Sequence, residues 1–163
     1  EKRKPDKTTA DSSATTKATT ENTTEAPKKT YSCTISIGCS TIFDNLELLR
    51  PEKKDYVPDD GVILGTVTAT FEEGDTVFEV LKSVCRDYGI QLEYSWTPMY
   101  GSYYIEGIHN LYEFDCGDGS GWMYSVNGWF PNYGCSSYEL KQGDVIKWLY
   151  TCDLGADVGS EMH

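Results

Sequence analysis

One amphipathic helical segment, set between stretches of alternating apolar residues, is the feature that most constrains the fold of this chain. Within residues 75–89, apolar side chains recur at helical spacing at Val77, Val80, Leu81, Val84, Cys85 and Tyr88. Asp75 or Thr76 suits the N-cap, and Gly89 is typical of the residue that ends a helix. A single helix cannot enclose a core, so this apolar stripe must pack on a sheet built from the flanking segments.

Two β-rich segments precede the helix. Residues 32–42 have the two-residue period of a half-buried strand, with one face formed by Cys33, Ile35, Ile37 and Cys39. Residues 62–71 form the second segment, after the turn signal at residues 59–61. We expect these two strands to form a hairpin with a long connection.

More β-like segments follow the helix, at residues 91–96, 103–108, 111–114, 121–126, 138–140 and 145–152. The Asn127-Gly128 pair is a strong hairpin signal, so residues 129–133 are expected to return as a strand beside residues 121–126. This order predicts the α+β class, as a β-grasp-like mixed sheet with one main α-helix packed across it.

Composition divides the chain sharply. Residues 1–30 contain nine Thr and no Val, Ile, Leu, Met or aromatic residue, so they have little to bury against the entropy of ordering. We therefore predict a disordered Thr-rich stalk at residues 1–30, one domain at residues 31–159 and a short tail at residues 160–163. The first residue is Glu1, which is consistent with removal of a leader.

The net charge argues against a nucleic-acid partner, and the distribution of apolar residues argues against a transmembrane segment. Residues 1–30 carry seven basic and five acidic residues, a net charge of +2. Residues 31–163 must therefore carry −14 to give the total net charge of −12. Because nucleic-acid binding depends on Lys and Arg neutralising phosphates, we expect no nucleic-acid partner. No stretch of about 18 apolar residues is present, so we expect no transmembrane segment.

Cysteine usage indicates the compartment. None of the six cysteines forms a C-x-x-C pair, and only His109 and His163 are available to complete a metal set, so no metal site is expected. Disulfides are the alternative, and they imply an extracellular setting. The pairing stays open, although Cys85 on the helix could reach Cys33 or Cys39. The disulfide candidates are Cys33, Cys39, Cys85, Cys116, Cys135 and Cys152.

No catalytic pattern stands out. Ser120 is not in a nucleophile elbow, and His109 is the one internal histidine available for a triad. The acids Glu113 and Asp115 are most simply solvated, and residues 115–120 fit a tight turn better than a calcium loop. We expect a protein that is not an enzyme and requires no cofactor.

Aromatic residues gather around two predicted turns. Alternating strands cannot bury all of them on one face, and aromatic side chains in loops stack on flat ligands or anchor partner chains. Trp122 and Trp148 lie inside strands and are expected in the core. The candidate ligand-binding residues are Trp96, Tyr100, Tyr103, Trp129, Phe130 and Tyr133.

Three segments carry a resemblance to a known family. Residues 71–81 (FEEGDTVFEVL), 120–128 (SGWMYSVNG) and 138–150 (YELKQGDVIKWLY) together resemble the transcobalamin-like C-terminal domain family. The likeness extends over essentially Tyr31 to Gly155.

The resemblance implies a soluble-ligand-binding β-grasp domain, with cobalamin or another corrinoid as the candidate ligand. In the cobalamin carriers of this family, a helical barrel supplies the other side of the ligand site. This sequence contains no helical barrel, so three expectations stay open: a half-site that binds weakly, a half-site that a partner chain completes, and loss of the ligand. Bacterial members resemble secreted lipoproteins or wall-anchored proteins, which suits a domain tethered to the cell surface by a stalk.

Two functions follow as hypotheses. A ligand-binding module predicts a concave, aromatic-lined surface between the 96–103 turn and the Asn127 hairpin. An adhesion or protein–protein interaction module, displayed on the bacterial cell surface for another surface protein, predicts a flat or convex patch without a pocket of about 300 Å³.

Overall fold

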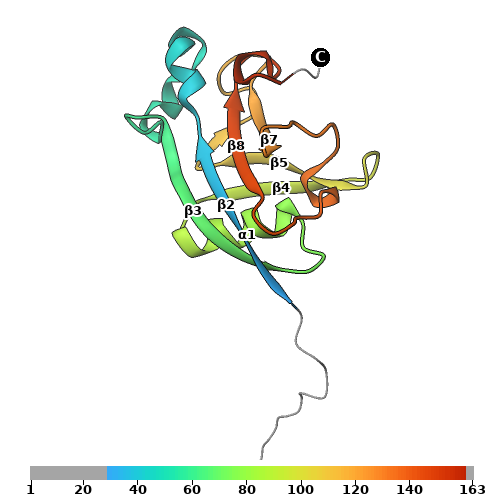
Figure 1. Ribbon diagram of the computed structural model, residues 1–163. Helices are drawn as coiled ribbons and strands as arrows, with labels where there is room; N and C mark the ends of the chain where they lie inside the picture. Colours follow the sequence, from blue (N-terminus) through green and yellow to red (C-terminus); the bar gives the residue numbers. More distant parts are fainter. Residues whose placement is uncertain (1–28, 161–163) are drawn as a thin grey trace, which may run out of the picture.

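The computed structural model describes residues 29–160, so nearly all of the predicted stalk and most of the predicted tail lie outside the described residues. Its main elements, in chain order, are β2 (Thr30–Gly38), β3 (Val62–Glu72), α1 (Val77–Tyr88), β4 (Leu92–Thr97), β5 (Ser102–Ile108), β6 (Leu111–Tyr112), β7 (Gly121–Val126) and β8 (Val145–Thr151) (Figure 1). Short 3-10 helices connect them: η3 (Ser40–Asp44), η4 (Leu46–Leu48), η5 (Pro51–Tyr56), η6 (Cys135–Ser137) and η7 (Ala156–Val158).

The strands form two sheets. The larger sheet has the order β3-β2-β8-β7, in which β2 and β8 are parallel and the other pairs antiparallel; the smaller sheet has the order β4-β5-β6. The α+β class with one main helix is thus confirmed, whereas the prediction of one sheet is wrong. Within the described residues, the strands β4, β5 and β6 pair only with one another.

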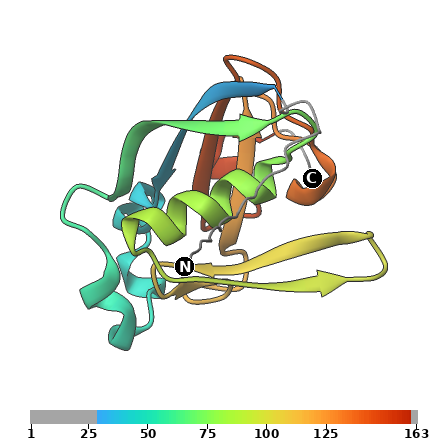
Figure 2. The same ribbon diagram turned by 90° about the horizontal axis from the view of Figure 1, so that it is seen from below.

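Helix α1 lies between the larger sheet and the β4–β5 hairpin (Figure 2). Its predicted N-cap and C-terminus are confirmed at Thr76 and Gly89, and Gly89 adopts a left-handed conformation with φ 69°. The apolar stripe is confirmed except that Tyr88 is exposed and Phe78 joins the buried set. Helix burial therefore follows the sequence period.

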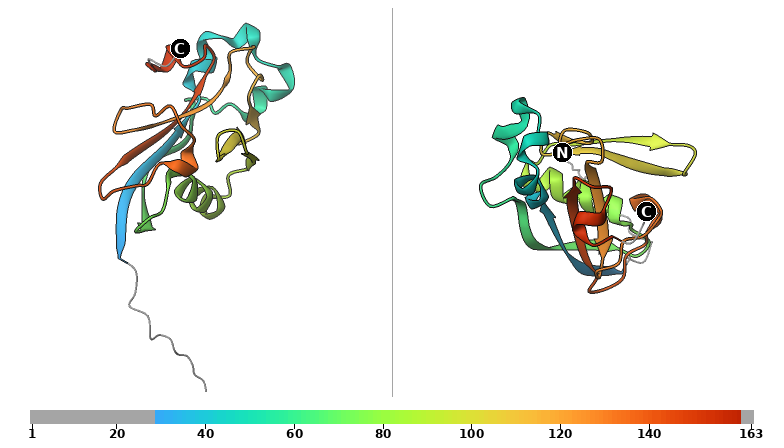
Figure 3. Two further views of the ribbon diagram at one scale, coloured as in Figure 1. Left: turned by 90° about the vertical axis from the view of Figure 1, so that its right-hand side faces the viewer. Right: turned by 90° about the horizontal axis from the view of Figure 1, so that it is seen from above.

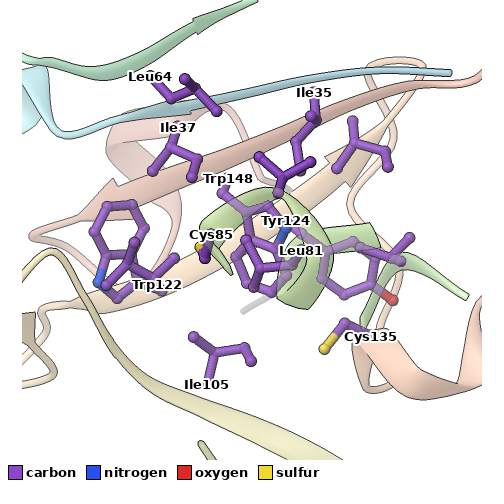
Figure 4. Close-up of a cluster of buried hydrophobic side chains, with 14 of the residues drawn as sticks. Ile35, Ile37, Leu64, Leu81, Cys85, Ile105, Trp122, Tyr124, Cys135 and Trp148 are labelled. Carbon is purple, nitrogen blue, oxygen red and sulfur yellow. The ribbon is translucent and has the colours of Figure 1, made fainter. Parts of the chain in front are cut away.

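The core is built where β2 and β8 lie side by side. Ile35 is paired with Ile146 and Ile37 with Trp148, and all four side chains are buried. Figure 4 shows Ile35 and Ile37 on one side of the cluster, and Ile105 of β5 on the opposite side, with Trp148 between them. The expected core position of Trp148 is thus confirmed.

Several expected strand segments are not strands. The chain leaves β2 after Gly38 and enters η3, and η3 to η5 lie at the end of the sheet far from Thr30 (Figure 3). Residues 129–133 make only a Val126–Trp129 bridge, and residues 138–140 make only a Thr76–Glu139 bridge.

The Asn127-Gly128 turn does form, with φ of 54° and 84° at its two residues. The Asn127 side chain, however, bonds to the start of β8: its Oδ1 accepts from Val145 N and its Nδ2 donates to Asp144, both at 2.9 Å. Pro131 then follows, and proline cannot donate a ladder hydrogen bond. After this turn the chain therefore continues as a loop and not as a strand.

All six cysteines are buried and unbonded in this structure, so the predicted disulfides are not confirmed. Cys85 faces the core, as expected, but bonds to neither Cys33 nor Cys39. Burial raises the pKa of the Cys33 thiol to about 11 and that of Cys85 to about 12.

Two absences hold for residues 29–160. No helix there is long and apolar enough to cross a membrane. Over the same residues, no three His, Cys, Asp or Glu side chains converge as a metal site would require.

Replacing Thr76 with Ala should destabilise the domain. The Thr76 hydroxyl and backbone N–H both donate to Glu79 Oε1, at 2.6 and 2.7 Å, at the N-terminus of α1. We expect T76A to lower the free energy of unfolding by about 1 kcal/mol in urea titrations. The T76S variant keeps the hydroxyl and should lose much less; equal losses in both variants would contradict a capping role.

Candidate functional site

An open cleft of about 420 Å³ lies between β5, β7 and the segment that leads into η6. Aromatic and apolar side chains predominate in its lining. The lining residues are Thr97, Tyr100, Ser102, Tyr103, Tyr104, Ile105, Trp122, Met123, Tyr124, Pro131, Asn132, Tyr133, Gly134, Cys135 and Trp148.

Three buried aromatic residues form the floor of the cleft. Tyr124 of β7 is paired with Trp148 of β8, and their ring centroids are 5.4 Å apart. The Tyr124 hydroxyl donates to the Tyr133 carbonyl at 2.8 Å, which ties the floor to the loop above it. Trp122 donates its indole N–H to the Leu111 carbonyl at 2.8 Å, which joins the floor to the smaller sheet. Figure 4 shows these floor residues between Ile35 and Ile37 on one side and Ile105 and Cys135, which also line the cleft, on the other.

The β5 wall is held by ring stacking. Tyr103 stacks on Phe78 of α1 with centroids 4.5 Å apart and planes 8° apart. Trp96 of β4 meets Tyr103 edge-on at 5.1 Å. Because α1 is itself fixed in the core, the stacking positions Tyr103 along the cleft.

The end of the cleft is closed where Gly134 approaches β5. Ser102 Oγ and Ser136 Oγ lie 2.7 Å apart, and Tyr103 N donates to Ser136 Oγ at 3.0 Å. A Cβ at Gly134 would lie 2.0 Å from Ser102 Oγ, so glycine is required there by space. Its φ of −67° shows that backbone strain is not the reason.

The cleft is electrically neutral. None of its described lining residues is Asp, Glu, Lys, Arg or His, although the chain from residue 31 onward carries a charge of −14. Glu113 is in direct contact with the lining and accepts a hydrogen bond from the Tyr104 hydroxyl at 2.9 Å. Burial, and then that hydrogen bond, raise the pKa of Tyr104. Burial likewise raises the pKa of Cys135 to about 12, so this thiol is protonated at neutral pH.

The structure brings together half of the candidate residues that the sequence singled out. Tyr100, Tyr103 and Tyr133 line the cleft. Trp96, Trp129 and Phe130 do not. The Trp129 ring lies 6.3 Å from that of Tyr133, beside the mouth of the cleft, whereas Trp96 lies behind Tyr103 on the smaller sheet.

The sequence interpretation missed the floor of the cleft. The sequence predicts Trp122 and Trp148 in the core, and both are buried, but each also contributes to the lining. Strand alternation identifies the inner face of β7 and β8, yet it cannot show that the layer opposite them is incomplete. Pro131 and Gly134 gave the best available signal, because both favour a loop at this point in the chain.

Comparison with known proteins gives a partial family match. Residues 74–151 match the family described as a domain of unknown function, DUF4430. The match runs from the turn before α1 to the end of β8, so it includes all the strands that line the cleft. No curated protein shows significant sequence similarity to the chain.

Solved structures provide a likeness of fold. Haptocorrin in complex with Cbi is similar with a TM-score of 0.50 and 15% identity, over 78% of this chain. This chain covers 26% of the haptocorrin chain, about a quarter of it. A protein from Ruminococcus gnavus ATCC 29149, named as a candidate metal-binding protein, gives a TM-score of 0.43 and 14% identity over 74% of this chain and 96% of its own. At these identities the likeness to haptocorrin shows a shared fold alone.

Replacing Gly134 with Ala should disrupt the closed end of the cleft. The new methyl group would overlap Ser102, so either η6 or β5 must move. We expect G134A to lower the melting temperature by several degrees in thermal unfolding, as overpacking costs about 1–3 kcal/mol. Adding S102G removes the overlapping atoms and should recover part of the loss; no recovery would mean that the two residues are not in contact.

Proposed function

We propose that this chain is a ligand-binding module without enzymatic activity and that the cleft between β5 and β7 is its ligand site. The observation that carries this proposal is the size and lining of the cleft. A volume of about 420 Å³ lies within the range of small-molecule sites, which are concave and mostly apolar with a few polar groups.

The chemistry of the cleft supports binding over catalysis. Within the described lining, the cleft offers no carboxylate, imidazole or amine to transfer a proton. Its cysteine, Cys135, has its pKa raised to about 12 by burial, and a protonated thiol is a poor nucleophile.

A corrinoid is the proposed ligand. The support is the fold shared with haptocorrin, which has been crystallised with Cbi, together with the family resemblance of the sequence. Because this chain corresponds to about a quarter of haptocorrin, the proposal includes a partner chain that closes the open side of the cleft.

Calorimetric titration with cobalamin and with an incomplete corrinoid tests this proposal. If the cleft is the site, titration of the whole chain gives saturable heat, and the Y100A/Y133A variant weakens binding by about tenfold or more, since stacked aromatic rings are removed. The matched control is Y88A, which removes an exposed tyrosine from α1 outside the cleft. Absence of heat at millimolar ligand would exclude the chain alone as a corrinoid binder.

The proposed setting is extracellular, with the domain tethered to the cell surface by residues 1–30. The cysteines support it. Cys152 Sγ contacts Thr41 Oγ1 of η3 at 3.7 Å, and Cys116 Sγ contacts the carbonyl of Asn45, the residue after η3, at 3.4 Å. The Cys116 and Cys152 side chains are also within hydrogen-bonding reach of each other. These two thiols are therefore placed to form a disulfide in an oxidising compartment.

Oxidation should link Cys116 to Cys152. With oxidised glutathione, the two thiols lose two protons and two electrons and form one S–S bond, while the oxidant is reduced to two thiols. Non-reducing peptide mapping should recover the linked peptides in the wild type and in C33S, but not in C116S. If both thiols stay free after oxidation, the disulfide and its support for an extracellular setting are lost.

An adhesion module remains the second candidate, because one element exposes apolar side chains outside the cleft. The β4–β5 hairpin projects from the rest of the domain (Figure 2). Met99 at its tip is 82% exposed, and Trp96 is 52% exposed. Such a hairpin suits contact with another surface protein, and M99A, which changes a residue outside the cleft lining, would then weaken that contact without affecting ligand titrations.

A further inference from the structure

One buried nitrogen stands out in the floor of the cleft. Trp148 is only 2% exposed, and its Nε1 is the one buried side-chain nitrogen or oxygen within residues 29–160 that has no hydrogen-bond partner. The same residue contributes to the lining of the cleft.

Three neighbouring aromatic side chains have partners for their polar atoms. Trp122 Nε1 donates to Leu111 O at 2.8 Å, Tyr124 Oη donates to Tyr133 O at 2.8 Å, and Tyr150 Oη donates to Tyr112 O at 2.7 Å. An unpaired buried donor destabilises a fold, and such groups in proteins call for an explanation. A ligand bound in the cleft would supply the missing acceptor, because Trp148 contributes to the cleft lining.

The lining sets the charge of that ligand. A charged group placed in the cleft would lose its hydration and find no counter-ion among the described lining residues. An anion would also meet the nearby Glu113 carboxylate, which already holds the Tyr104 hydroxyl. The part of a ligand that enters the cleft must therefore be neutral.

We infer that the cleft selects a neutral, flat, apolar group bearing one hydrogen-bond acceptor, and that Trp148 Nε1–H donates to this acceptor. The inference rests on the proposed function of the cleft as a ligand site. Tyr103 and Tyr133 supply aromatic surfaces in the cleft lining. The hydrogen bond from Trp148 sets the orientation of the bound group. Because Nε1 is covered in this structure, the acceptor reaches it only when the side chains that cover it move.

Three probes of nearly equal size separate these requirements. They are 2-acetylnaphthalene, which is neutral and has a carbonyl acceptor, 2-ethylnaphthalene, which is neutral without an acceptor, and 2-naphthoate, which is an anion. With the whole wild-type chain, we expect the acetyl compound to bind about fivefold more tightly than the ethyl compound, the effect of one net hydrogen bond. Naphthoate should not saturate at millimolar concentration.

Nitrogen-15 NMR of the indole groups locates the bond. The chain has four tryptophans and hence four indole N–H signals, and the W148F spectrum identifies the one from Trp148. The acetyl compound should shift the Trp148 signal downfield, whereas the ethyl compound should not. Trp122 is the internal control: it also lines the cleft, but its N–H is already bonded to Leu111, so its signal should respond equally to the two neutral probes.

The W148F variant completes the test by comparing two ligands in one protein. It should abolish the fivefold preference for the acetyl compound while still binding the ethyl compound, so a general loss of stability cannot mimic the result. Equal affinity of the two neutral probes for the wild type, or saturable naphthoate binding, would overturn the inference and leave the cleft as a ligand site. Failure of both neutral probes to bind would overturn the inference and the proposed site together, whereas failure of corrinoids alone would leave the inference standing.

Discussion

The burial of α1 on two sides is the constraint on which the rest of this structure depends. Leu81 and Cys85 pack into the core beneath the larger sheet, and Phe78 stacks on Tyr103 of the smaller sheet. The smaller sheet has only three strands, and such a sheet needs an apolar surface to pack against before it is stable. The helix provides that surface, so a change that loosens α1 also moves the wall of the cleft.

This arrangement explains why a cleft exists at all. β5 and β7 lie near each other but belong to different sheets, and no ladder of hydrogen bonds draws them together. The space between them is bounded by bulky rings from both sides and is closed at one end by the contact of Gly134 with Ser102. A cavity at the junction of two layers is a natural consequence of splitting one sheet into two.

The sequence predicts those features that arise from local periodicity. The helix, its caps and the inner face of β8 follow from side-chain spacing, and Ile146 and Trp148 are buried as their alternation requires. Strand partners are different, because pairing is decided by the register of residues distant in the chain. Asn127 shows the limit clearly: its turn forms as predicted, but its side chain bonds to Val145 and Asp144, so the chain that follows does not return beside β7.

The acidic residues and the cleft occupy different parts of the molecule: the cleft lining is uncharged, and the acidic residues lie outside it. Two acids are buried among residues 29–160, Asp115 and Asp144. Asp115 lies within 3.4 Å of both Arg50 Nε and Lys53 Nζ, and Asp144 accepts hydrogen bonds from Lys141 N and Asn127 Nδ2, so both charges have partners. The excess of acids therefore belongs to the surface, where it repels anions over a distance of about 8 Å at physiological ionic strength. A neutral cleft within such a surface discriminates twice, first against anions that approach and then against any charge that must be buried. A ligand that carries positive charge outside the cleft and inserts a neutral, acceptor-bearing group would satisfy both conditions.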